Sequence, residues 1–186
     1  ISDGWTLMGF PDRALALHEE LLVRFAQHPT VVLEVNRSMA EMLSSRGDYS
    51  SALAVLERIS GFPLDDRQSG DLLALRGRLY AEQGENGAAL ASYVELQHRF
   101  PEYPDTDGSV SLAMATIAYN MGNVEQAEEA LEGLDEGEVS SAVGANAALL
   151  MGNIKAYNGD NLAAQNVWRG VIERFSDNAA VVESAR

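Results

Sequence analysis

The 186-residue sequence contains no cysteine, which excludes disulfide bonds, thiolate catalysis and cysteine-ligated zinc. It also lacks any continuous apolar run near the ~20 residues that a membrane-spanning helix needs, so direct membrane insertion is not expected. Apolar residues nevertheless make up 46% of the chain, enough to bury a sizeable core. The sequence therefore predicts a folded chain that is held together by packing alone.

Positive charge is scarce: the chain has a single lysine, Lys155, and no basic residue between Arg99 and Lys155. The net charge of −15 disfavours nucleic acid and anionic membrane surfaces as partners and favours neutral or basic ones. The gap without basic residues holds ten acids, which form either a solvated helix face with loop charges or an acidic docking patch. These acids are Glu102, Asp105, Asp107, Glu125, Glu128, Glu129, Glu132, Asp135, Glu136 and Glu138.

What the chain does have is a regular series of small residues. Five glycines recur at alternating intervals of 38 and 37 residues: Gly9, Gly47, Gly84, Gly122 and Gly159. An alanine follows each glycine by five positions (Ala14, Ala52, Ala89, Ala127, Ala164), and a small residue precedes the last four by seven (Ala40, Gly77, Ala115, Gly152). A fixed period in this range predicts a helical repeat protein.

Between the glycines, apolar residues recur at three- and four-residue steps, which predicts two amphipathic helices per repeat. Each glycine is expected to end the first helix in a left-handed conformation, and Asp48 is expected to cap the helix that follows it. The expected helices include 12–26, 30–46, 71–83, 87–100, 109–121, 124–134, 140–158, 162–175 and the start of another at 179–186. The expected repeat units of one solenoid over 1–186 are 1–29 (partial), 30–65, 66–106, 107–139, 140–178 and 179–186.

This arrangement of small residue, glycine and alanine resembles the tetratricopeptide repeat, in which a large apolar residue also follows the glycine by nine positions. His18, Leu56, Tyr93, Leu131 and Trp168 stand there, so four of the five fit. The repeats are longer than the usual ~34 residues, and the aromatic residue expected early in the first helix is absent. The resemblance implies an all-α fold, a right-handed α-α superhelix of antiparallel helix pairs.

Two segments, 96–101 and 171–177, end the second helix with Arg-Phe before a turn. They are similar to bacterial envelope repeat proteins such as the TolA-binding periplasmic protein and outer-membrane assembly lipoproteins, although cytosolic bacterial arrays share this ending. A periplasmic or envelope location is therefore favoured over the cytoplasm. The partial first unit also suggests a segment of a longer array, and its exposed apolar surface suggests weak self-association.

In this family the concave face is lined by the first helix of each pair and usually holds a peptide or a partner helix. The resemblance places Arg37, Glu41, Arg78, Thr116, Tyr119, Asn120, Asn146, Asn153 and Tyr157 on that face. Its early part is charged, whereas its late part combines asparagine amides with tyrosine rings, a combination that suits sequence-tolerant peptide capture. The alternative is that these residues merely fill the groove, or that the tyrosines pack between repeats.

No catalytic or metal-binding pattern accompanies the repeats. His18, His28 and His98 are far apart in the sequence, and residues 105–108 resemble the start of a calcium loop but lack its later ligands, which favours a turn with a helix cap. We therefore expect no cofactor and no enzymatic activity. The expected function is a protein-binding scaffold or adaptor. The alternatives are a structural spacer or oligomerisation segment of a larger envelope protein, and a regulatory domain of a longer protein.

Overall fold

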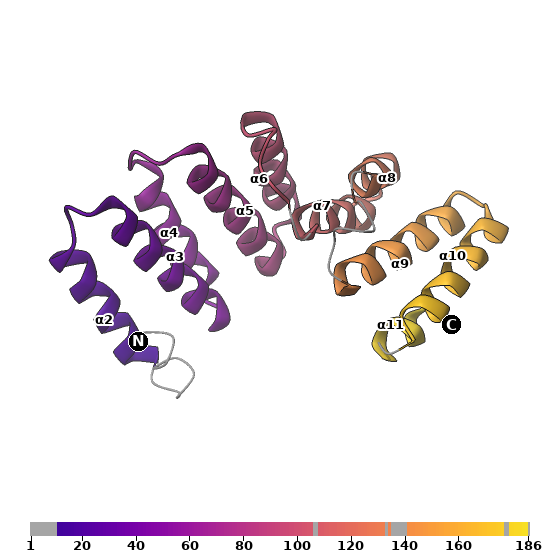
Figure 1. Ribbon diagram of the computed structural model, residues 1–186, viewed down its shortest axis with the longest axis horizontal. Coiled ribbons are helices and arrows are strands. Elements are labelled where there is room, and N and C mark those ends of the chain that lie inside the picture. Colours follow the sequence, from indigo (N-terminus) through magenta and orange to yellow (C-terminus); the bar gives the residue numbers. More distant parts are fainter. Residues whose placement is uncertain (1–10, 106–107, 133, 135–140, 177–178, 186) are drawn as a thin grey trace. The chain divides into compact units, whose positions relative to one another are not determined.

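The computed structural model describes residues 11–105, 108–132, 134, 141–176 and 179–185. Every regular element in this part of the chain is an α-helix, and Figure 1 shows them lying side by side in antiparallel pairs. The chain divides into two compact units, Ile1–Tyr103 and Pro104–Arg186. None of the described helices is both long and apolar enough to cross a membrane. The one continuous solenoid expected over 1–186 stays a prediction.

The described part of the first unit contains five helices, and each of them packs against the next along the chain. They are α2 (Pro11–Arg24), α3 (Pro29–Ser45), α4 (Tyr49–Ser60), α5 (Asp66–Gln83) and α6 (Asn86–Arg99). The core between α3, α4 and α5 is aliphatic, and Ile59 and Leu79 are 1% and 0% exposed at its centre. Burial of such side chains from water is the main source of stability in a fold of this kind.

The second unit repeats this arrangement. It contains α7 (Ser109–Asn120), α8 (Val124–Glu132), α9 (Ser141–Tyr157), α10 (Asn161–Arg174) and α11 (Ala179–Ser184). Here α7 packs against α8 and α9, while α9 also packs against α10 and the short α11. Ile154 of α9 is fully buried against α7 and α8, so α9 is the central helix of this unit.

The turns within the helix pairs form as the glycine spacing predicts. Gly47, Gly84, Gly122 and Gly159 all have φ between +76° and +85°, the left-handed region that side chains disfavour. The residue after each glycine donates its backbone N–H to the carbonyl five positions earlier, as Asp48 does to Leu43 over 3.0 Å. The predicted Asp48 cap is confirmed, because its carboxylate accepts the N–H of Ser51. The first glycine, Gly9, lies outside the described residues.

The small residues before and after each glycine are buried together between the two helices of a pair. Ala52, Ala89, Ala127 and Ala164 are all 0% exposed, as are Ala40 and Ala115 on the preceding helices. An alanine presents only a methyl group, so the two helices of a pair can approach to the ~8–10 Å that close packing requires.

In each pair, a residue of the second helix packs against the small residue of the first helix, and its size alternates between repeats. A Cβ added to Gly77 would lie 2.6 Å from the Tyr93 ring, and one added to Gly152 would collide with Trp168. In two other repeats a leucine, Leu56 or Leu131, stands where Tyr93 and Trp168 stand in their repeats. Ala40 lies in the same core cluster as Leu56, and Ala115 in the same cluster as Leu131. Glycine thus accompanies an aromatic ring and alanine accompanies leucine, which makes the true structural period two repeats, or 75 residues.

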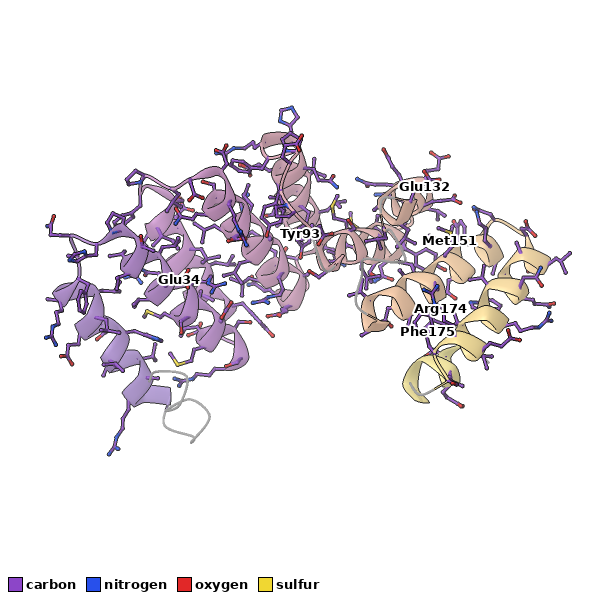
Figure 2. All side chains as sticks on the ribbon, in the orientation of Figure 1. Glu34, Tyr93, Glu132, Met151, Arg174 and Phe175 are labelled. Atoms are coloured by element: carbon purple, nitrogen blue, oxygen red, sulfur yellow. The ribbon has the colours of Figure 1, made fainter. Side chains whose placement is uncertain are left out.

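The same 75-residue period appears at the ends of the second helices. The guanidinium carbons of Arg24, Arg99 and Arg174 lie 5.7, 5.2 and 5.4 Å from the ring centres of the phenylalanines that follow them. Figure 2 shows the last of these pairs, Arg174 and Phe175, at the end of α10. The Arg-Phe ending is therefore a recurring cation–π contact at the end of every second repeat.

Three predicted helix limits are wrong by two residues or more, and one of them is the end of α2, which lies at Arg24 rather than at residue 26. The first helix of the third repeat begins at Asp66 rather than at residue 71, because Asp65 and Gln68 form a capping box in which each side chain accepts the other's backbone N–H. Asp71 lies inside this helix and accepts a hydrogen bond from the Tyr103 hydroxyl over 2.9 Å. Helix α8 ends at Glu132, two residues before its predicted end. The sequence also predicts a partial helix before Gly9 and a helix cap at 177–178, and both lie outside the described residues.

Candidate functional site

A groove of about 400 Å³ lies between α7 and α9 in the second unit. It brings together five of the nine residues that the sequence nominated: Thr116, Tyr119, Asn120, Asn146 and Asn153. Leu112, Leu149 and Leu150 complete its lining. The nominated residues of the late repeats therefore share one surface.

Helical periodicity explains this grouping. The α7 residues of the groove are 112, 116, 119 and 120, and the α9 residues are 146, 149, 150 and 153. Steps of three and four residues keep side chains on one face of a helix. Since α7 and α9 pack against each other, their two faces meet in one concave surface.

The polar groups of the groove are available for an incoming chain. Asn120, Asn146 and Asn153 are exposed, and their side chains make no hydrogen bond to another residue that the structure describes. Each amide offers two donor hydrogens and an acceptor oxygen, the complement of a peptide backbone. Thr116 differs, because its hydroxyl proton is already donated to the Leu112 carbonyl over 2.8 Å, which leaves only its acceptor capacity.

Tyr119 and Tyr157 pack edge to face, with ring centroids 6.4 Å apart and planes at 74°. Tyr119 also packs against the core of the second unit, so the alternative that it packs between repeats holds in part. Tyr157 does not line the groove but stands beside it with 67% of its surface exposed. The pair therefore adds an exposed aromatic edge to the Tyr119 end of the groove.

The other three nominated residues, Arg37, Glu41 and Arg78, lie on α3 and α5 of the first unit. Arg78 is within 3.9 Å of Glu41 and 3.8 Å of Glu82, and Arg37 pairs with Glu34 over 3.1 Å. These side chains are about half exposed, so the pairs stabilise the fold by at most ~1 kcal/mol each. We call this exposed set (Glu34, Arg37, Glu41, Arg78 and Glu82) the charged strip.

The acidic stretch of the late repeats is a solvated helix face in its described part. Glu125, Glu129 and Glu132 are exposed on α8, and Figure 2 shows Glu132 projecting from that helix. Glu128 instead pairs with Lys155 of α9, and this hydrogen bond raises the pKa of Lys155 above its ordinary value. The four acids Asp107, Asp135, Glu136 and Glu138 lie outside the described residues, so a docking patch there stays a prediction.

The sequence reasoning missed a network of hydrogen bonds and ion pairs between partly exposed side chains of α5 and α6 in the first unit. The Arg99 and Arg76 guanidiniums both hydrogen-bond Glu95, and they hold its pKa below the ordinary value. Arg76 also donates from Nε to the Ser92 hydroxyl over 3.1 Å. The sequence signal was a charge on the apolar face of a helix, since Arg76 lies four residues after Leu72 and three before Leu79.

This network predicts a small pH dependence of stability. Because folding lowers the pKa of Glu95, its stabilising contribution is present above the unfolded value of about 4.3 and disappears as the pH falls through the folded value. We expect urea unfolding to show wild type more stable than Glu95→Gln by less than about 1 kcal/mol at neutral pH, since the carboxylate is partly exposed. The two proteins should converge as the pH falls through the lowered pKa of Glu95; a constant difference would contradict this origin.

Among the described residues, no cluster of three or more histidine or acidic side chains is placed to hold a metal ion. Asp105 caps α7 by accepting the N–H groups of Val110 and Ser111 over 3.1 and 2.8 Å, as the predicted cap requires. Residues 106–107 of the predicted turn lie outside the described residues. His18 is only 2% exposed, and its Nε2 lies 3.3 Å from the Ser38 hydroxyl. It thus occupies the buried position that leucine, tyrosine or tryptophan holds in the other repeats.

Comparison with known proteins places the fold. No protein-family model and no curated protein matches the sequence. Among solved structures, a tetratricopeptide repeat protein from Parabacteroides merdae superposes with a TM-score of 0.77 at 17% identity, over 99% of this chain and 68% of its own. PilF from Pseudomonas aeruginosa gives 0.74 at 14% identity (98% and 76%), and MamA gives 0.70 at 16% (97% of both). The chain therefore has the expected all-α tetratricopeptide-repeat fold, while the envelope location stays a prediction.

Proposed function

We propose that this chain is a non-enzymatic protein-interaction scaffold, and that the groove between α7 and α9 holds an extended or helical segment of a neutral or basic partner. The observation that carries the proposal is the meeting of three exposed asparagine amides over a leucine floor in one groove. Amides satisfy backbone groups of any sequence, and the leucines accept apolar side chains.

The distribution of charge assigns different roles in binding to the groove and to the rest of the surface. No residue that lines the groove is charged, so contacts there are expected to depend little on salt. The net charge of −15 instead attracts a basic partner from a distance and raises its association rate. On the first unit, we assign the same partner-binding role to Arg37, Glu41 and Arg78 of the charged strip, whose contacts should weaken as salt is added.

The proposal predicts that peptides selected by the chain from a random-peptide phage library lose affinity when the amides are removed. We expect the double variant Asn146→Ala/Asn153→Ala to bind a selected, fluorescently labelled peptide roughly tenfold more weakly, because two neutral hydrogen bonds are lost. The melting temperature should not change, since both side chains are exposed. Fluorescence polarisation and thermal denaturation measure the two quantities.

The matched control is Asn166→Ala, which removes an exposed amide from α10 outside the groove. It should bind the peptide as wild type does. If the library yields no specific peptide, and the chain instead associates mainly with itself in sedimentation experiments, the proposal fails in favour of a spacer or oligomerisation segment.

A further inference from the structure

A second cavity lies in the first unit, among α4, α5 and α6, and has a volume of about 130 Å³. Its apolar wall includes Leu53 and Leu56 of α4 and Leu72 and Leu73 of α5. Two guanidinium groups, those of Arg76 and Arg99, also line it. The rest of its polar lining comes from the carboxylate of Glu57 and the hydroxyl groups of Ser60, Ser69 and Tyr80. Arg76 precedes Arg78 of the charged strip by two positions, which places the two side chains on nearly opposite faces of α5.

The two arginines keep hydrogen-bonding capacity beyond their contacts in the protein. A guanidinium has five N–H donors. Arg76 uses Nε for Ser92 and one terminal nitrogen for Glu95, at 3.1 and 2.5 Å, and Arg99 uses one nitrogen for Glu95 at 2.8 Å. Glu95 thus holds both groups in place, while their other donors form no hydrogen bond within the described part of the chain.

The second unit shows that the fold does not require this network. At the 75-residue period, Met151, Val167 and Gly170 stand where the first unit has Arg76, Ser92 and Glu95. Met151 packs against the apolar core of its unit, and Figure 2 shows it on α9. Apolar and small residues therefore build the same helix pair, whereas a partly buried arginine carries a desolvation cost. A ligand that uses Arg76 accounts for its presence, whereas Arg99 recurs as Arg174 in the second unit.

From these observations we propose that the cavity binds a compact apolar group that carries a carboxylate, either a free monocarboxylic acid or the C-terminal residue of a partner chain. The leucines receive the apolar group, and the volume matches a branched aliphatic or phenyl group, since a cavity of ~150 Å³ holds benzene. The spare donors of Arg76 and Arg99 hold the carboxylate, which is the anion that the planar guanidinium matches in geometry.

The test is a titration of the ¹⁵N-labelled chain with 4-methylpentanoate, followed by amide chemical shifts. We expect saturable shifts confined to α4, α5 and α6, and no such shifts with the uncharged 4-methylpentanamide. The variant Arg76→Met takes the residue that the second unit already accommodates, so its fold should persist. It should bind roughly tenfold or more weakly, because a charge-assisted hydrogen bond is lost. Glu95→Gln should bind more tightly, since it removes a competing negative charge.

A short peptide ending in leucine, compared as free acid and as C-terminal amide, distinguishes the two sources. Tighter binding of the peptide acid than of 4-methylpentanoate assigns the cavity to a partner's C-terminus, and the reverse order assigns it to a small acid. The proposal is overturned if neither acid gives saturable shifts, if the amides bind as well as the acids, or if Arg76→Met binds as wild type does. None of these readouts depends on the groove of the second unit.

Discussion

Replacing Ala89 by arginine is expected to unfold the first unit locally and to lower its stability by at least about 3–5 kcal/mol. Ala89 is 0% exposed at the contact between α5 and α6, so a guanidinium there has neither water nor an acidic partner of its own. Repeat proteins derive their stability from each repeat and its neighbours, and one lost helix pair therefore exposes the next. Circular dichroism during thermal unfolding measures the loss.

The same helix supplies a matched control. Ala91→Arg makes the identical change two residues away, where the side chain is exposed to solvent, and its effect should stay within about 0.5 kcal/mol. Equal melting temperatures for the two variants would contradict the assignment of Ala89 to the helix contact. The comparison isolates burial, because charge, size and helix propensity change by the same amounts in both variants.

The features that the sequence predicted well are those set by local geometry. The turns are left-handed at four glycines, and only glycine adopts a positive φ without steric cost, so the glycine positions alone predict them. These glycines are Gly47, Gly84, Gly122 and Gly159. The buried alanines follow from the same register. The composition of the groove can also be inferred from the sequence, because steps of three and four residues fix which side chains share a helix face. That is why Thr116, Asn120 and Asn153 were found together.

The features that the sequence reasoning missed are one local capping pair and contacts between residues far apart in the chain. The expected start of α5 at residue 71 was wrong, because the reciprocal hydrogen bonds of Asp65 and Gln68 begin the helix at Asp66. Arg76 and Glu95 meet only once α5 and α6 have packed, so neither residue alone indicated a network. Tyr157 was assigned to the groove by its repeat position, but at the end of α9 it contacts Tyr119 beside it.

The pairing of glycine with an aromatic ring gives the second large effect. Gly77→Ala should destabilise the first unit by about 1–2 kcal/mol, although alanine is the better helix former by about 1 kcal/mol. The added Cβ would lie 2.6 Å from the Tyr93 ring, which is only 3% exposed and has no free space to move into. Gly87→Ala is the control, since nothing lies within 4 Å of its Cβ and φ is not positive. It should stabilise by up to about 1 kcal/mol.

The double variant Gly77→Ala/Tyr93→Leu tests whether the two positions act as one unit. It installs in the third repeat the alanine–leucine pair that Ala40 and Leu56 already form in the second. Tyr93→Leu alone should cost about 2–4 kcal/mol by leaving a cavity, and the added methyl group should then fill space rather than collide. Urea unfolding of the four proteins should give a favourable coupling energy of about 1–2 kcal/mol. Strict additivity would contradict the 75-residue structural period, because that period requires each ring to be matched to its own glycine.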